Sequence, residues 1–177
     1  MRSAWIGLGS NLGDAALALR RAIAQLARLP ETQLRAVSAP YHTAPWGETD
    51  QPDFLNAVAK LATSLSPRML LDALLAIEDQ LGRQRGGRRW GPREIDLDLL
   101  VYEGIVLDEP GLTVPHPRLH QRAFVLVPLH DLSPGLDIPG HGSVTELLAA
   151  LGDDERAGIK VAGSAHEGGH AGHYRGA

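Results

Sequence analysis

Residues 83–101, RQRGGRRWGPREIDLDLLV, join a cationic stretch to an alternation of acidic and apolar residues. The alternation around Asp96 and Asp98 has the two-residue period of a β-strand, and we predict a strand over residues 96–102. Successive side chains of a strand point to opposite faces, so the two carboxylates share one face, with their roots about 6 to 7 Å apart. The residues predicted to face the other side are Leu97, Leu99 and Val101.

The first half of this stretch concentrates positive charge. Its five arginines, which stand among three glycines and Trp90, are Arg83, Arg85, Arg88, Arg89 and Arg93. Guanidinium groups suit bidentate contacts to phosphate and stay charged at physiological pH. Magnesium is usually held by one or two carboxylates, with substrate phosphates completing its shell. The stretch therefore predicts a phosphoryl-transfer centre in which Asp96 and Asp98 are the metal ligands.

Composition limits the alternatives. The 177 residues fit one domain with a proper core. The net charge of -4 makes the arginine cluster a local feature, which argues against a protein that binds nucleic acid by broad phosphate neutralisation. The absence of cysteine excludes disulfides and thiolate metal sites. The sequence has neither an apolar run of about 18 residues nor the pattern of a secretion signal, so we expect a cytoplasmic protein without membrane contact.

Two nucleotide-binding motifs are excluded by their spacing. The glycines of GLGSNLG (residues 7–13) are one residue too far apart for the dinucleotide fingerprint, so we interpret them as glycines of a tight turn from a strand into a helix. The chain has no Gly-x4-Gly-Lys-Ser/Thr motif, and its only lysines are Lys60 and Lys160. An ATP site in this chain is therefore not of the P-loop kind.

Hydrophobic period and turn residues predict the order of elements. In the first half we expect a strand (3–9), a helix capped by Asn11 or Asp14 and ended by Pro30 (15–29), a strand (33–38), a proline-rich loop (39–47), a strand (54–63) and a helix (69–81) that follows Ser66 as N-cap and Pro67 at its first position. In the second half we expect a hairpin that turns at residues 103–104 and returns over 105–107, a stiff segment that holds His116 between two prolines (112–118), a helix (124–132), short strands (136–138 and 158–161) and a short helix between them (144–151).

Several single residues have both a functional and a structural interpretation. Trp46 in the proline-rich loop suits ligand binding or a lid over the core. Phe54 and Asn56 share a strand face and suit a flat heterocycle, although an Asn there is also a common turn residue. Glu78 is either a solvated helix residue or a ligand contact. Residues 163–177 form a Gly- and His-rich segment, which we interpret as a disordered tail after a domain of residues 1–162 rather than as a metal site.

Four motifs occur together in this order. They are GSNLG (9–13), DQPDFLN (50–56), RWGPR with DLD (89–93 and 96–98), and VPHP with RAF (114–117 and 122–124). In this combination the chain closely resembles the 6-hydroxymethyl-7,8-dihydropterin pyrophosphokinase family of folate biosynthesis over roughly residues 3–161. The resemblance implies an α+β fold of the ferredoxin-like plait type, with helices packed on an antiparallel sheet. It also implies an ATP-dependent diphosphotransferase, in which the hydroxymethyl oxygen of the pterin attacks the β-phosphorus of ATP and AMP leaves.

The resemblance assigns roles to individual residues. It implies two magnesium ions at Asp96 and Asp98, with Arg83 and Arg93 on the phosphates during catalysis. The residues implied to bind ATP are Glu78, Arg85, Arg89, Trp90, His116 and Arg122. The residues implied to hold the pterin are Thr43, Trp46, Phe54, Asn56 and Phe124. The implied partners are these two small molecules, with no nucleic acid and no membrane, and we expect a monomer.

The chain also departs from the family at four positions. Leu75 stands where some members have Gln, Phe54 where others have Tyr, Trp46 where others have a smaller apolar residue, and Pro117 where some have Tyr. Two other functions fit the same elements: a single-stranded RNA-binding module, whose sheet would stack bases, and an inactive subunit of the same fold. The RNA-binding alternative is weakened because the predicted sheet has no aromatic cluster and the two aspartates would repel phosphate unless metal is bound.

Overall fold

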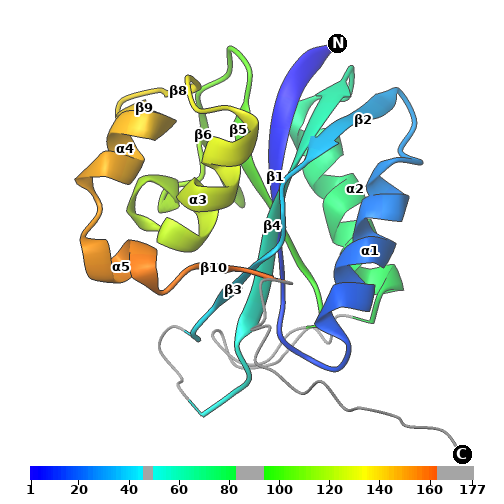
Figure 1. Ribbon diagram of the computed structural model, residues 1–177. Coiled ribbons are helices and arrows are strands. Elements are labelled where there is room, and N and C mark those ends of the chain that lie inside the picture. Colours follow the sequence, from blue (N-terminus) through cyan, green and yellow to red (C-terminus); the bar gives the residue numbers. More distant parts are fainter. Residues whose placement is uncertain (46–49, 83–93, 163–177) are drawn as a thin grey trace, which may run out of the picture.

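An antiparallel six-stranded sheet lies between two layers of helices in the computed structural model, which describes residues 1–45, 50–82 and 94–162 (Figure 1). The sheet contains β1 (Arg2–Ser10), β2 (Thr32–Val37), β3 (Tyr41–Thr43), β4 (Phe54–Thr63), β5 (Asp96–Tyr102) and β10 (Lys160–Val161). Two small hairpins are formed by β6 (Leu107–Glu109) with β7 (Leu112–Val114), and by β8 (Asp137–Ile138) with β9 (Gly142–Ser143). The helices are α1 (Ala15–Leu26), α2 (Pro67–Gln80), the 3-10 turn η1 (Leu119–Gln121), α3 (Ala123–Leu132), α4 (Val144–Ala150) and α5 (Asp153–Ala157).

Strand β1 is the centre of the sheet, with β4 on one side and β5 on the other. Both neighbours run antiparallel to it. Two glycines of β1 have a partner on each neighbouring strand. Gly9 pairs with Asn56 and Asp96, and Gly7 pairs with Val58 and Asp98. On the other edge of β4, the short strand β3 pairs with the first residues of β4, and β2 pairs with its last residues.

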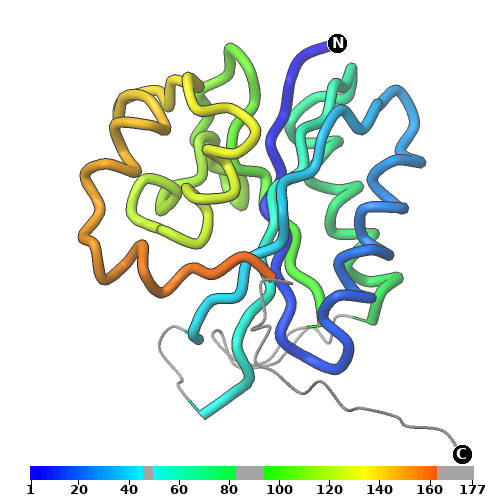
Figure 2. Tube along the Cα trace, in the orientation of Figure 1, coloured from blue at the N-terminus to red at the C-terminus, as the bar shows by residue number. Residues whose placement is uncertain are grey.

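Helices α1 and α2 cover one face of the sheet (Figures 1 and 2). Asp14 caps α1 by accepting the Leu17 N–H, and Ser66 caps α2 by accepting the Met69 N–H, as the sequence predicts. The predicted end of α1 at residue 29 is wrong, because α1 ends at Leu26 and a tight turn follows. Proline disfavours helical geometry in the residue before it, which is Leu29, so the helix does not extend to residue 29.

Helices α3 and α4 cover only part of the other face. They pack on Trp5, Val58, Leu100 and other residues of a second buried cluster. The rest of this face, where β1 carries Gly7 and Gly9, is left to a cavity. One end of the sheet therefore borders a cavity large enough for a ligand.

A β-bulge in β5 corrects one prediction. Ile6 pairs with Leu99 and Trp5 with Val101, so Leu100 is the extra residue. Leu97 and Leu99 lie in the cluster under α1 and α2, as predicted, but Val101 lies in the opposite cluster. The bulge reverses the alternation after Leu99, which a strict two-residue period does not anticipate.

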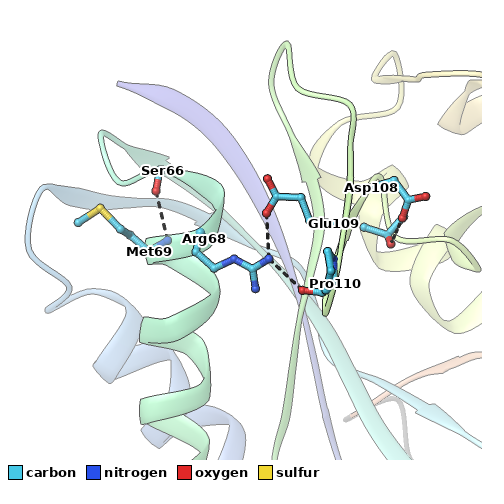
Figure 3. Close-up of polar contacts among 7 residues, drawn as sticks. Ser66, Arg68, Met69, Asp108, Glu109 and Pro110 are labelled. Atoms are coloured by element: carbon cyan, nitrogen blue, oxygen red, sulfur yellow. Dashed lines mark hydrogen bonds and ion pairs between the residues drawn. The ribbon is translucent and has the colours of Figure 1, made fainter.

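The hairpin predicted between residues 96–102 and 105–107 is also wrong. The turn at residues 103–104 exists, but β6 pairs with β7, and Gly111 between them has a φ of 76°. Arg68 in the first turn of α2 fixes this hairpin: its Nη2 donates to Glu109 Oε2 at 2.9 Å and to the Pro110 carbonyl at 3.0 Å (Figure 3). The hairpin is thus hydrogen-bonded to α2 through Arg68, while no ladder pairing joins β6 to β5.

Two smaller differences, and one prediction that stays untested, concern the edges of the fold. The segment predicted as a loop over residues 39–47 contains β3, which pairs with β4. Helix α5 is absent from the predicted elements. The tail predicted over residues 163–177 lies outside the described residues. Within the described residues, no helix has the length and apolar character needed to cross a membrane.

Candidate active site

A cavity of about 510 Å³ opens on the sheet face that α3 and α4 leave uncovered. Its walls come from β1, β4, β5, the segment between β7 and α3, and the chain around α5. The side chains predicted to bind ligands and found among its lining residues are Thr43, Phe54, Asn56, Asp96, Asp98, His116, Arg122 and Phe124. The structure therefore brings together candidates that are up to 81 positions apart (Thr43 to Phe124) in the sequence.

Glycines form the floor of this cavity. A Cβ atom on Gly9 would lie 2.9 Å from Asn56 Oδ1, and one on Gly7 would lie 3.3 Å from a Leu100 methyl group. The interpretation of residues 7–13 as turn glycines is therefore wrong for Gly7 and Gly9, which lie inside β1, and right for Gly13, whose φ is 58°. Two glycines on one face of a central strand let a flat ligand lie close to the backbone. The two-residue spacing of Gly7 and Gly9 was the feature of the sequence that could have placed both on one face of a strand.

Asp96 and Asp98, called the aspartate pair below, lie on the cavity face of β5 as predicted. Both are half-buried, and their β1 partners are Gly9 and Gly7. Two hard carboxylates that share a cavity fit a magnesium ion whose remaining ligands come from substrate and water. No group of three or more His, Asp or Glu residues able to hold a metal ion occurs in the described part of the chain.

Cationic and neutral donors face the aspartate pair. Arg122 is half-buried, and burial lowers the pKa of its guanidinium while the carboxylates of Asp98 and Asp96 raise it. Burial also lowers the pKa of His116 to about 4, helped by the charge of Arg122 and opposed by Asp96. His116 is therefore a neutral imidazole at neutral pH. Its Nδ1 accepts the Arg118 backbone N–H at 3.2 Å, so the imidazole proton sits on Nε2.

Arg118 is a lining residue that the sequence analysis missed. It lies after the second proline of the VPHP motif, and no periodic pattern marks it. It lowers the pKa of both His116 and Arg122 through its charge, after the larger effect of burial. The cavity is therefore lined by one more arginine than the sequence motifs predicted.

Aromatic and amide groups also line the cavity. Phe54 and Phe124 both line it, and the Arg122 guanidinium lies 5.6 Å from the Phe124 ring centroid. Asn56 Nδ2 donates to Thr43 Oγ1 at 2.8 Å in a buried hydrogen bond. This bond orients the amide so that Oδ1 is the atom above Gly9. Asn56 therefore presents a hydrogen-bond acceptor at the cavity floor.

Glu78 is buried at the interface between α2 and β5. Its side chain is 1% exposed, so the solvated interpretation is wrong. Its Oε1 accepts the Leu97 backbone N–H at 2.7 Å, and Glu78 is not among the described residues that line the cavity. The contact with ATP implied for Glu78 stays a prediction.

Six other predicted ligand-binding residues lie outside the described residues: Trp46, Arg83, Arg85, Arg89, Trp90 and Arg93.

The family model described as 7,8-dihydro-6-hydroxymethylpterin-pyrophosphokinase (HPPK) matches residues 5–134. The chain belongs to this family. The HPPK of Methylorubrum extorquens is 50% identical over 151 residues, which cover 85% of this chain and 94% of that protein. The HPPK of Pseudomonas aeruginosa is 50% identical over 82% of this chain and 90% of that protein, and that of Haemophilus influenzae is 43% identical over 86% and 95%.

Solved structures support the fold of this HPPK-family chain. An HPPK-DHPS in complex with substrates has a TM-score of 0.64 at 12% identity over 84% of this chain. A Plasmodium falciparum HPPK-DHPS with pterin and p-hydrobenzoate has a TM-score of 0.67 at 13% identity over 90% of this chain. The chain spans less than half the length of these two structures, 43% and 47%, so the likeness concerns a mixed α+β fold with an antiparallel sheet.

Proposed function

We propose that this HPPK-family enzyme transfers diphosphate from ATP to the hydroxymethyl group of 6-hydroxymethyl-7,8-dihydropterin within the cavity described above, as a step of folate biosynthesis. The hydroxymethyl oxygen forms a bond to the β-phosphorus, the bond from that phosphorus to the oxygen bridging to the α-phosphorus breaks, and AMP leaves. The hydroxyl proton is released. The observation that carries the proposal is that one cavity contains the aspartate pair and Arg122 together with an aromatic and amide subsite.

The pterin fits the subsite formed by Phe54, Asn56 and Phe124. A pterin is a flat heterocycle whose amide edge carries N–H donors, and Asn56 Oδ1 is an acceptor whose orientation is set by Thr43. The glycine floor leaves space for the ring next to β1. Stacking against an aromatic ring contributes about 0.5–1.5 kcal/mol beyond area burial.

The phosphates of ATP fit the other side. Magnesium ions held by the aspartate pair would supply Lewis-acid stabilisation of the charge that develops on the phosphate oxygens. Arg122 offers guanidinium donors, and His116 offers Nε2–H as an uncharged donor, because a pKa of about 4 leaves its ring as neutral imidazole near pH 7. The cavity therefore combines a cation-binding edge with fixed donors, which is what positioning an in-line displacement requires.

The roles implied for residues outside the described part are included in this proposal as predictions. They place Arg83 and Arg93 on the phosphates, Arg85, Arg89 and Trp90 on the nucleotide, and Trp46 on the pterin. The implied contact of Glu78 with ATP, two magnesium ions, a monomer and a cytoplasmic location are further predictions.

We also infer that the fold is a ferredoxin-like plait. The order β1-α1-β2 followed by β4-α2-β5, with β2-β4-β1-β5 as neighbours in the sheet, supports this classification. The RNA-binding alternative loses support, because helices cover much of both sheet faces and the described lining of the cavity includes only two Phe, Tyr or Trp side chains.

A product assay tests the proposed function. Purified protein with magnesium, ATP and the pterin should yield AMP, and ADP as the nucleotide product would reject the reaction. Asp96→Asn and Asp98→Asn should lower kcat by orders of magnitude while the circular dichroism spectrum is retained. The control is Asp72→Asn, since Asp72 is exposed on α2. Wild-type turnover in both site variants would remove the metal assignment.

A further inference from the structure

Glu78 places a carboxylate where the packing of α2 calls for an apolar side chain. Leu70, Leu74 and Glu78 follow at intervals of four residues, and all three are buried. A buried carboxylate loses its hydration, so it is retained only where it has specific partners. A partner in this fold is the N–H of Leu97 on β5, 2.7 Å from Glu78 Oε1.

Leu97 stands between the two members of the aspartate pair. Strand β5 is the last strand of the path β10-β3-β4-β1-β5, so among the described strands only β1 pairs with it. An edge strand has half the ladder bonds of a central one, and β5 already departs from regular pairing at its bulge. The Leu97 N–H bond to Glu78 therefore supplies an anchor for β5 besides its pairing with β1.

This anchor acts on the direction of both aspartates. A buried backbone N–H that loses its acceptor costs free energy, so the Leu97 peptide is held where Glu78 can accept its hydrogen bond. Holding the Leu97 peptide fixes the backbone between Asp96 and Asp98, so that both carboxylates stay on the cavity face while Leu97 stays in the core. Outer-shell partners of metal ligands commonly matter in this way for metal affinity.

We propose that Glu78 is a positioning residue for the aspartate pair, acting through the Leu97 backbone. The inference rests on the proposed function, because it assumes that the aspartate pair holds the metal of the nucleotide complex. It concerns the acceptor atom of Glu78 rather than its charge. A glutamine at position 78 keeps the acceptor and a leucine removes it.

Two measurements on metal-free and metal-loaded protein test the proposal. The first is hydrogen exchange of the Leu97 amide without metal, and the second is the affinity for Mn²⁺ in the absence of nucleotide, so that the ATP contact predicted for Glu78 enters neither measurement. Glu78→Leu should expose the Leu97 amide to exchange and weaken Mn²⁺ binding by about tenfold or more. Glu78→Gln should keep the amide protected and bind Mn²⁺ within about threefold of wild type, as the retained acceptor requires. Asp72→Leu, which makes the same kind of substitution at an exposed site of α2, should change neither quantity.

The outcomes separate this inference from the proposed function. Equal weakening in Glu78→Gln and Glu78→Leu, or wild-type behaviour in Glu78→Leu, would overturn it. If Glu78→Leu fails to fold, Glu78→Gln decides: a protected Leu97 amide with near-wild-type Mn²⁺ affinity supports positioning, and any other result overturns it. Asp98→Asn should lose Mn²⁺ affinity in the same assay. If Asp98→Asn keeps that affinity, the proposed metal site fails, whereas a loss in Asp98→Asn alone overturns only the role of Glu78.

Discussion

At the scale of single residues, the site depends on its glycines, which have no side chain, as much as on the larger residues that line the cavity. Gly9 lies between Asn56 on β4 and Asp96 on β5, so it separates the aromatic and amide subsite from the aspartate pair. Any side chain there would occupy the space between the two proposed substrates. The hydrogen bond from Asn56 to Thr43 means that the amide cannot turn away without losing a buried partner.

Gly9→Ala is therefore expected to impair pterin binding specifically. The added Cβ would lie 2.9 Å from Asn56 Oδ1, closer than such contacts allow, so the amide must move. We expect KM for the pterin to rise about 5- to 150-fold, the equivalent of the roughly 1–3 kcal/mol that a displaced buried hydrogen-bonding group costs. Steady-state kinetics with the pterin as varied substrate measure this, with Gly135→Ala as control because nothing lies within 4 Å of the added atom. An unchanged KM in Gly9→Ala would show that Asn56 does not set the fit of the ring.

At the scale of elements, the N-terminus of α2 is stabilised by two contacts of different kind. Ser66 Oγ accepts the Met69 N–H at 3.2 Å, and Arg68 reaches across to the β6–β7 hairpin (Figure 3). The Arg68–Glu109 pair is largely exposed, with side chains 42% and 46% accessible. Ion pairs of this kind contribute about 0.2–1 kcal/mol, whereas an N-cap serine contributes about 1 kcal/mol and up to 2.

We accordingly expect Ser66→Ala to destabilise the protein more than Arg68→Ala. Urea unfolding should show a loss of about 1 kcal/mol for Ser66→Ala. Arg68→Ala should lose less, and its loss should shrink at high salt because exposed charges are screened. Arg28→Ala, at an exposed position after α1, is the control for removing a surface arginine. A larger, salt-independent loss in Arg68→Ala would mean that its bond to the Pro110 carbonyl, and not the ion pair, dominates.

At the scale of the whole molecule, local signals predicted the elements, and pairing between distant segments determined the site. The bounds of β4 and β5 were anticipated because alternation and flanking turns mark them, and the start of α2 because Ser66-Pro67 is a local signal. The β6–β7 pairing, the bulge at Leu100 and the bond from Glu78 to Leu97 depend on which strand lies beside β5. No short window of sequence contains that information. The aspartate pair was recognisable because both of its residues lie in one strand.

The same whole-molecule view predicts how stability responds to acid. Burial lowers the pKa of His116 to about 4, and it also lowers the pKa of His120, whose ring stacks on His141 at 3.8 Å. Below about pH 6.5 the unfolded chain therefore binds more protons than the folded chain at these two sites, so stability falls as pH falls.

His120→Phe keeps a ring beside His141 and removes both the ionisable group and the unpartnered Nδ1. Its melting temperature should fall less than that of wild type between pH 7.5 and about pH 5, a window chosen above the range in which most carboxylates titrate. Scanning calorimetry on metal-free protein measures this, with His42→Phe on the exposed side of β3 as control for the substitution. Parallel melting curves for His120→Phe and wild type across that window would show that His120 takes up its proton equally in the folded and unfolded chains.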